Sequence, residues 1–181
     1  CDMGPIMEVA KQHNLRVIED CAQASFATYK GQPVGSIGHA AAFSFCQDKI
    51  MSTGGEGGML TTNDNQVWER AWSFKDHGKS YDAVYNRQHP SGFRWLHESF
   101  GTNWRMLEFQ AAIGRIQLKK LPEWVRIRRS YARMLNEAFA DLPVLRLTIP
   151  GPEFGHSYYK YYVFVRPERM KNDWNRDRIM E

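Results

Sequence analysis

The spacing of apolar and polar positions predicts an alternation of helices and strands over the first 75 residues. Apolar residues recur at helical spacing from Pro5 to His13, and a short apolar run follows them. The predicted elements are a helix at 5–13, strands at 15–19, 40–45 and 58–62, a small hairpin at 29–35 and a helix at 65–74. A helix followed by a strand, and then repeated, is typical of a parallel α/β sheet.

The pattern is interrupted between Lys75 and Gly101, where periodicity is lost and Gly, Pro, His and Asn accumulate. A loop of this length within a compact domain is usually functional or disordered. Among the residues of this loop are the aromatic Tyr81, Tyr85, Phe93 and Trp95, and Arg94. Their presence favours an ordered loop that lines a site.

Helical spacing returns at residues 106–118 and 122–140, and alternating aromatic and β-branched residues predict a strand at 158–165. We therefore expect an α/β chain in two parts. Residues 1–122 are predicted to form part of a large domain, a mostly parallel sheet flanked by helices. Residues 123–181 are predicted to form a connecting helix and part of a smaller α+β C-terminal domain.

Composition adds few constraints. Of the 181 residues, 43% are hydrophobic and 24% charged, as in an ordinary globular protein. No run approaches the roughly 20 apolar residues that span a membrane, so we expect no membrane partner. Three scattered cysteines lack zinc or disulfide spacing, which predicts no metal site and fits a cytoplasmic location. The chain starts at Cys1 and ends in what reads as an unfinished helix, so we expect material to be missing at both ends.

The formal net charge of +4 is modest. Four arginines gather on one predicted helix: Arg126, Arg128, Arg129 and Arg133. Such a cluster could contact nucleic acid, or it could be a solvated helix face. No recognition motif accompanies the charge, so we favour the solvated face and expect no nucleic acid among the partners.

Candidate chemistry centres on Lys49, which follows one predicted strand and precedes a glycine-rich segment at 54–58. Asp20 stands at the end of an earlier apolar strand. An acid paired with a lysine at strand ends is what a pyridoxal 5'-phosphate site needs. The acid keeps the pyridinium nitrogen protonated, so that the ring accepts electrons, and the lysine forms a Schiff base.

Ser44 also lies at the end of a predicted strand, so three separated positions could converge on one pocket. In open α/β sheets, ligands bind beyond the carboxyl ends of the strands. Each residue has a simpler interpretation: Asp20 could cap a helix, Lys49 could be a surface lysine, and Ser44 could be a satisfied core hydroxyl. Their joint occurrence, in this order and beside the glycine-rich segment, favours a site.

The motifs around these residues resemble the DegT/DnrJ/StrS-type sugar aminotransferases, pyridoxal-phosphate enzymes of the aspartate-aminotransferase fold (fold type I). The resemblance covers essentially the whole chain. It is carried by residues 17–24 (Val-Ile-Glu-Asp-Cys-Ala-Gln-Ala), 28–31, 34–35, 42–45 (Ala-Phe-Ser-Phe), Lys49, 55–58 (Gly-Glu-Gly-Gly), 77–78, 101–106 (Gly-Thr-Asn-Trp-Arg-Met) and 110–114. Motifs this long and this regularly ordered are far more specific than one short glycine pattern.

The resemblance implies a role for each matching position. Lys49 would hold the cofactor covalently and shuttle the proton, and Asp20 would pair with the pyridinium nitrogen. Gln23 would lie near the ring, and Ser44 would bind the phosphate. Asn103 would reach the cofactor phosphate of a neighbouring subunit, which implies a homodimer with shared sites.

The implied reaction is ping-pong transamination, in which glutamate or glutamine donates an amino group and a nucleotide-linked keto-sugar accepts it. The family also takes cofactor contacts from residues upstream of those matched here. We therefore expect the 181 residues alone to bind the cofactor weakly or not at all.

One departure and two rival functions qualify this interpretation. His39 stands where relatives usually place Asp, and we expect it to be structural. Of the remaining histidines, only His77 is a candidate for a place near the substrate. Sugar dehydratases of the same family carry His at the position of Lys49, so the lysine argues against that activity. The joint presence of Asp20, Gln23, Ser44 and Lys49 argues against a regulatory homologue without catalysis.

Overall fold

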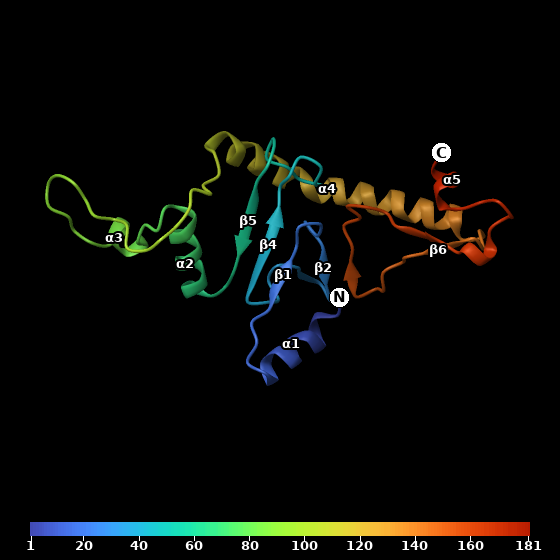
Figure 1. Cartoon of the computed structure of the whole chain (residues 1–181), viewed down its shortest axis with the longest axis horizontal. Coiled ribbons are helices and arrows are strands. Elements are labelled where there is room, and N and C mark those ends of the chain that lie inside the picture. The colour runs from blue at the N-terminus through green and yellow to red at the C-terminus, as the bar shows by residue number, and fades with distance from the viewer.

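A three-stranded sheet lies at the centre of the chain (Figure 1). The computed structural model describes all residues, 1–181. The strands are β1 (Ile18–Asp20), β4 (Ala40–Ser44) and β5 (Gly58–Thr61), in the order β1-β4-β5. β1 and β4 are parallel and β4 and β5 antiparallel, so the sheet is mixed within this chain. The predicted α/β fold class is confirmed.

The strand predicted at 15–19 begins later, because the residues before it close the preceding helix α1 (Met3–Gln12). Asn14 adopts a left-handed backbone with φ 51°, and Leu15 N donates to Ala10 O at 2.8 Å. Such a helix end satisfies carbonyls that have no partner further along the helix. Residues 15–17 of the predicted strand therefore end α1 and connect it to β1.

The predicted hairpin is present as β2 (Thr28–Tyr29) and β3 (Gln32–Pro33), which pair antiparallel. A third strand, β7 (Phe154–Gly155), pairs with β2 from the C-terminal part of the chain. The sequence pattern did not predict β7, because two residues carry no periodicity. Its pairing brings the C-terminal segment back to the region before β4.

One helix, α4 (Glu108–Phe139), replaces the two helices predicted on either side of Pro122. A proline inside a helix removes one hydrogen bond and usually kinks or ends it. Here Leu121 is 3% exposed and Val125 fully buried, and both pack in one core cluster with Phe45, Ile50 and Met51. This packing holds the helix together across the proline, so the predicted interruption was wrong.

The predicted loop at 75–101 contains a short helix and packs on its neighbour. Helix α2 (Asn65–Lys75) is capped by Asp64, and α3 (Tyr81–Tyr85) by Ser80. Tyr81 makes edge contacts with both tryptophans of α2, Trp68 and Trp72, and Tyr85 makes one with Trp72 and a tilted contact with Tyr81. We call α2, α3 and the loop up to residue 104 the arm, because they extend away from the sheet (Figure 1).

The arm is ordered, as predicted, and it borders an open hollow of about 800 Å³ between α2, α3 and residues 98–100. None of the predicted cofactor residues lines this hollow. Phe93 and Trp95 stack on each other at the tip and remain 76% and 81% exposed. Tyr81 and Tyr85 therefore anchor the loop on α2, whereas Phe93, Trp95 and Phe100 face outward.

The C-terminal part forms a small ribbon of β6 (Leu145–Leu147) and β8 (Val163–Val165), followed by a 3-10 turn at Pro167–Arg169 and α5 (Arg176–Met180). The strand predicted at 158–165 is thus shorter. Tyr158 has φ 49°, which strands do not use, and Arg128 Nη1 bonds the carbonyl oxygens of Tyr158 and Tyr159 at 3.2 and 3.4 Å.

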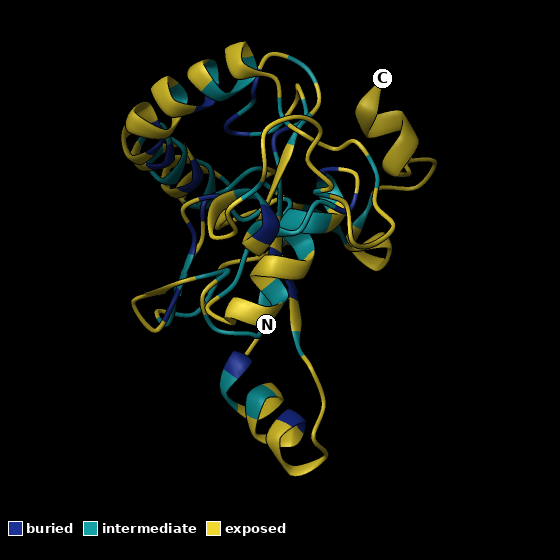
Figure 2. Cartoon of the chain, turned by 90° about the vertical axis from the view of Figure 1, so that its left-hand side faces the viewer, coloured by how far each residue is buried: buried dark blue, intermediate teal, exposed yellow.

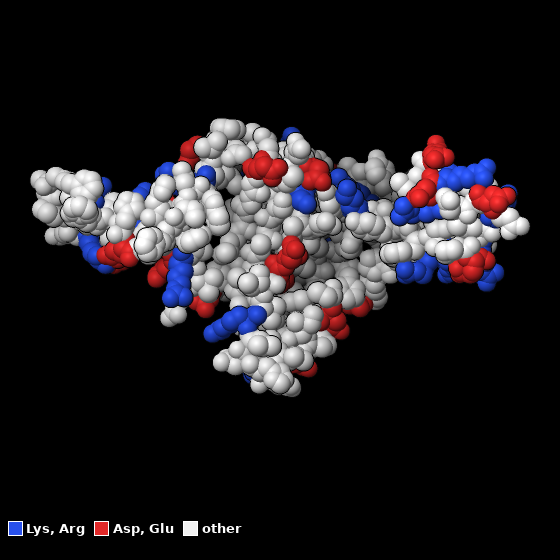
Figure 3. All heavy atoms as spheres, viewed as in Figure 1, with Lys and Arg blue, Asp and Glu red and all other residues white.

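The arginine cluster on α4 is only partly a solvated face. Arg129 bonds the carbonyl oxygens of His156 and Gly155, at 2.9 and 3.0 Å, while Arg126 pairs with Glu123 on the helix itself. Together with Arg128, Arg129 therefore fixes residues 155–159 against α4. Positive and negative side chains intermix over the face seen in Figure 3.

Much of the chain is exposed (Figure 2). Its accessible surface is 13450 Å², whereas a compact monomer of 21.1 kDa exposes about 9,000 Å². Large apolar side chains such as Ile18, at 74%, are among the exposed residues. Several apolar faces therefore lack a covering layer within these 181 residues. None of the helices combines the length and the apolar character required to cross a bilayer.

Candidate active site

Asp20 and Ser44 point to the same face of the central sheet. Asp20, the last residue of β1, lies opposite Ala42 in the parallel pair, and Ser44 follows two residues later at the end of β4. Side chains alternate between the faces of a sheet, so Asp20, Ala42 and Ser44 share one face. Ser44 lies about 6–7 Å beyond Ala42 along the strand. The carboxylate and the hydroxyl therefore stand near each other on neighbouring strands.

We call this side of the sheet the open face. It also carries Ile18 and Leu60, which are 74% and 46% exposed, and no element of this chain covers it. Ala42 is exposed between Asp20 and Ser44, so a flat surface of small side chains separates the two polar groups. Such a surface leaves room for a planar ring.

Asp20 keeps half of its hydrogen-bonding capacity free. Its Oδ1 accepts from Ala22 N at 3.0 Å, in a turn rather than at a helix start, and Oδ2 has no protein partner. Ser44 Oγ accepts from Cys46 N at 3.3 Å and remains half-buried. The predicted alternative for Asp20, a helix cap, is therefore not what the structure shows, because no helix begins after β1.

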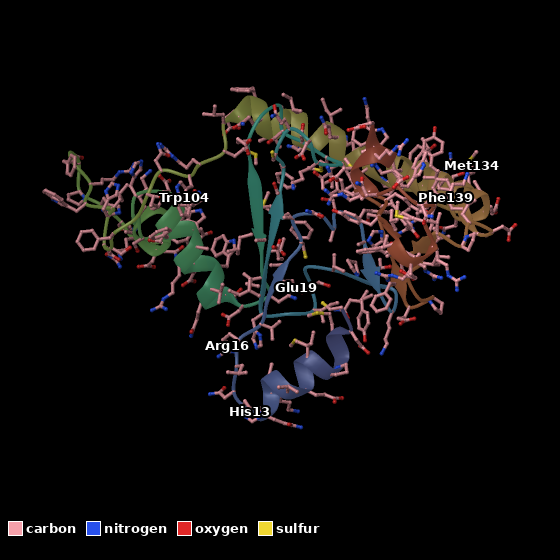
Figure 4. All side chains as sticks on the ribbon, turned by 45° about the vertical axis from the view of Figure 1, so that its right-hand side comes forward. His13, Arg16, Glu19, Trp104, Met134 and Phe139 are labelled. Carbon is pink, nitrogen blue, oxygen red and sulfur yellow. The ribbon has the colours of Figure 1, made fainter.

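The opposite, closed face is organised by Glu19 (Figure 4), which is buried. Its carboxylate accepts three backbone hydrogen bonds, from Gly35 N and Ile37 N at 2.8 Å and from Gly38 N at 2.6 Å. Hydrogen bonds to an ionised acceptor are among the stronger ones in proteins. Glu19 thus ties β1 to the loop that leads into β4.

His39, at the end of that loop, has structural contacts only. Its Nδ1 accepts from Val17 N at 3.0 Å, and its backbone N–H donates to Val17 O at 2.9 Å. Its carbonyl oxygen accepts from Thr62 Oγ1 at 2.6 Å. These bonds align the starts of β1 and β4, in agreement with the structural role expected for this residue.

Lys49 lies in the loop that follows β4, between residues anchored in the core. Its backbone N–H donates to Cys46 O at 3.1 Å, and Ile50 and Met51 belong to the buried cluster beneath α4. The side chain is half-buried and forms no ion pair. Its Nζ lies 4.9 Å from the centre of the Tyr159 ring, within the range of a cation–π contact.

Tyr159 also contacts Asp48, the residue before Lys49. Its hydroxyl donates a short hydrogen bond to Asp48 Oδ2. This hydrogen bond raises the pKa of Tyr159 to about 12 and lowers the pKa of Asp48 below its ordinary value. At neutral pH the phenol is therefore protonated and the carboxylate ionised, which is the state in which the bond is strongest.

Gln23 and Asn103 are not brought to Lys49 within this chain. Gln23 is exposed in a turn after β1, and its side chain makes no hydrogen bond. Asn103 lies in the arm, where it bridges to Asp76 and accepts from Arg105 Nε at 3.1 Å. The next residue, Trp104, lies beside α2 (Figure 4). His77 is exposed in the same part of the arm, with φ 60°.

Sequence reasoning missed Tyr159, Glu19 and the two arginines on α4 that hold residues 155–159. Tyr159 stands 111 positions from Asp48, and no short-range pattern joins them. Glu19 did offer a signal, because a carboxylate inside a buried strand needs partners, and backbone N–H groups of a glycine-containing loop can supply them.

The residues present suit pyridoxal 5'-phosphate chemically. A free carboxylate oxygen, a hydroxyl and a primary amine follow the ends of two adjacent strands, with exposed alanine between the first two. These groups match a pyridinium nitrogen, a phosphate and an aldehyde, respectively. The roles of the five predicted residues in binding this cofactor remain predictions.

No group of three or more His, Cys, Asp or Glu side chains is arranged to hold a metal ion. All three cysteines are free thiols. Burial, together with the charges of Glu19 and Asp20, raises the pKa of Cys21 to about 11, so this buried residue stays a thiol at neutral pH.

Comparison with known proteins finds relatives in both sequence and fold. The aminotransferase from Psychrobacter cryohalolentis is 57% identical and superposes with a TM-score of 0.94 over 99% of this chain and 47% of that one. Spore coat polysaccharide biosynthesis protein SpsC of Bacillus subtilis is 39% identical over 91% of this chain and 42% of its own length. GDP-perosamine synthase of Caulobacter vibrioides is 41% identical over 78% of this chain and 35% of its own.

The chain thus spans less than half the length of these relatives. The model of the DegT/DnrJ/EryC1/StrS aminotransferase family matches residues 1–181, the whole of this sequence. The mixed α/β fold is that of part of a fold type I domain. The protein belongs to the DegT/DnrJ/EryC1/StrS aminotransferase family.

Proposed function

We propose that this protein is a pyridoxal-phosphate-dependent aminotransferase that moves an amino group from glutamate or glutamine to a nucleotide-linked keto-sugar. The observation that carries the proposal is the placement of Asp20 and Ser44 on one open sheet face, with Lys49 in the loop that follows. A chain that matches an aminotransferase family over its full length supplies the context.

Each side chain has a separate task in this proposal. The free Oδ2 of Asp20 holds a proton on the pyridinium nitrogen, and Ser44 Oγ donates to the phosphate. Lys49 binds the cofactor covalently and, once released, carries the proton between the two carbon atoms that exchange it. The bound cofactor supplies an electron sink for the carbanion formed from the amino donor. Donor and acceptor then use the same site in turn, which is ping-pong kinetics.

Two relatives support a sugar as the acceptor. GDP-perosamine synthase and the spore coat polysaccharide protein both have names that point to sugar chemistry. In this proposal the protein works in polysaccharide or amino-sugar biosynthesis in the cytoplasm, where its free thiols stay reduced.

We further propose a homodimer in which Asn103 serves the neighbouring subunit's site. Within one chain Asn103 is held in the arm and does not contact Lys49. The arm exposes Trp104 and Phe100, which are 70% and 99% accessible, as an interface would in an isolated subunit. Gln23, exposed beside Asp20, is proposed to approach the ring.

The division into a large domain at 1–122 and a smaller part at 123–181 is kept as a proposal. Helix α4 crosses that boundary without interruption, and Leu121 and Val125 pack in the same cluster on its two sides. We therefore place the boundary within the length of α4 rather than in a linker.

The first prediction tests Lys49. In the full-length protein, Lys49→Ala is expected to abolish transamination and the absorbance band of the covalent cofactor adduct, because Lys49 is the residue proposed to bind the cofactor covalently. The band, and its loss on borohydride reduction, can be followed in a spectrophotometer during cofactor titration.

Lys119→Ala is the matched control, since Lys119 is exposed on α4 and should leave both signals unchanged. Transamination that persists in Lys49→Ala would contradict the assignment. Product analysis addresses the dehydratase alternative: a product that has lost a hydroxyl and gained no nitrogen would favour that activity over amino transfer.

A further inference from the structure

Tyr159 contacts two adjacent residues of opposite charge. Its hydroxyl donates to Asp48 Oδ2, and the face of its ring lies 4.9 Å from Lys49 Nζ. Asp48 and Lys49 nevertheless form no ion pair with each other. The hydrogen bond from Tyr159 thus engages an oxygen of the Asp48 carboxylate, the anion adjacent in sequence to Lys49.

The position of Tyr159 is set from outside the loop that carries Asp48 and Lys49. Arg128 on α4 holds the carbonyl oxygens of Tyr158 and Tyr159, and the Tyr159 ring packs on the core cluster around Val125. The bond to Asp48 therefore does not depend on the conformation of the lysine itself. It joins the C-terminal segment to the residue just before Lys49.

An amine that reacts with a carbonyl carbon must present its lone pair, so it must be neutral and unpaired at the moment of attack. A carboxylate in ion-pair contact favours the ammonium form, which has no lone pair. Asp48 is ionised at neutral pH with or without the tyrosine, and the hydrogen bond from Tyr159 lowers its pKa further. Without the hydrogen bond from Tyr159, the Asp48 carboxylate would be free to form an ion pair with Lys49 and to favour its ammonium form.

We propose that Tyr159 is a positioning residue that holds the Asp48 carboxylate away from the Lys49 amine and so keeps the amine available for covalent chemistry. The functional meaning of this contact rests on the proposed role of Lys49, but the contact itself can be tested without the cofactor. Tyr159→Phe is the informative variant, because it keeps the ring and removes only the hydroxyl.

The experiment measures the rate at which each lysine of the purified protein is acetylated by a trace of acetic anhydride, using mass spectrometry of the digested protein. In Tyr159→Phe we expect Lys49 to react about two- to fivefold more slowly, the range that a partly exposed ion pair supports. The double variant Tyr159→Phe, Asp48→Asn should restore the original rate, because the competing carboxylate is gone.

Three comparisons keep the result specific. Lys160 Nζ lies 5.1 Å from the centre of the Tyr159 ring, and its acetylation rate serves as the internal reference. Tyr162 is exposed, so Tyr162→Phe is the matched control variant. Asp48→Asn alone tests the proposal even if Tyr159→Phe unfolds: because Tyr159 already holds the carboxylate, Asp48→Asn should leave the Lys49 rate near the original, and a marked rise would contradict the proposal. If Tyr159→Phe leaves the acetylation rate of Lys49 unchanged, the proposal is overturned, whether or not the rate of Lys160 falls. It is also overturned if Lys49 is acetylated slowly in the double variant.

The result is independent of the proposed function. If Tyr159→Phe slows acetylation of Lys49 while the full-length protein forms no covalent adduct with pyridoxal 5'-phosphate, the positioning role stands and the aminotransferase assignment fails. If the adduct forms and Tyr159→Phe does not change the acetylation rate of Lys49, the aminotransferase assignment stands and the positioning role of Tyr159 fails.

Discussion

The two faces of the β1-β4-β5 sheet differ in what their polar residues do. On the closed face, Glu19 is buried and all its hydrogen bonds go to backbone N–H groups of the next loop. On the open face, Asp20 is exposed and keeps one carboxylate oxygen without a partner. Two adjacent acids in one strand are thus divided by the pleat into a structural residue and a candidate for chemistry.

This difference shows why residue type alone does not identify a site. Glu19 and Asp20 have the same charge and neighbouring positions, and only the direction of the side chain separates them. A carboxylate whose partners are all internal contributes to folding, whereas one with a free oxygen on an uncovered face can bind a ligand. Mutations of matched pairs across the two faces should therefore separate stability from function.

The largest expected effect is on the open face. Asp20→Asn should lower turnover about a thousandfold, because a neutral amide cannot hold a proton on the pyridinium nitrogen. The free energy of unfolding should change by less than about 0.5 kcal/mol, since the residue is exposed and its single hydrogen bond can be kept by the amide oxygen. Steady-state kinetics and urea unfolding give the two numbers. Turnover near the original value would show that Asp20 only closes its turn.

The closed face should respond in the opposite way. Glu19→Ala leaves three backbone N–H groups without their acceptor and should lower the free energy of unfolding by about 2–4 kcal/mol. Circular dichroism during urea unfolding measures this loss. Glu19→Gln, which keeps the shape and one acceptor oxygen, should lose less. If Glu19→Ala were as stable as the original chain, the loop at 35–38 would not depend on this residue.

The smallest effect is expected from a pair of alanines that are neighbours in β4. Ala41 is 1% exposed on the closed face, and Ala41→Leu should cost about 1–3 kcal/mol of stability by overpacking. Ala42 faces the open side, and Ala42→Leu should leave stability nearly unchanged while it weakens cofactor binding by filling the space between Asp20 and Ser44. Thermal unfolding and cofactor titration of both variants test this. Equal loss of stability in the two would mean that the open face is covered.

The sequence pattern predicted the elements that depend on local or strongly apolar signals. The strands at β4 and β5, helix α2 and the small hairpin were predicted closely, because each is marked by an apolar run or by turn residues. The placement of Asp20 and Ser44 at strand ends followed from the same signals. What joins them on one face is the register of β1 against β4, which the structure supplies.

Predictions failed where distant contacts outweigh local preference. Pro122 suggested a helix boundary, but burial of Leu121 and Val125 keeps α4 continuous. Tyr158 to Tyr162 alternate like a strand, yet Arg128 and Arg129 use the carbonyl groups of residues 155–159 that a ladder would need. Contacts of this kind connect residues about 30 positions apart and leave no periodic trace.

Helix α4 has a mechanical consequence. With 32 residues it is about 48 Å long. Near its middle it is packed against the loop that carries Lys49, and one turn further on its arginines hold the segment that carries Tyr159. Because one helix contacts both segments, the spacing between Lys49 and Tyr159 depends on α4 and not on the Lys49 loop alone.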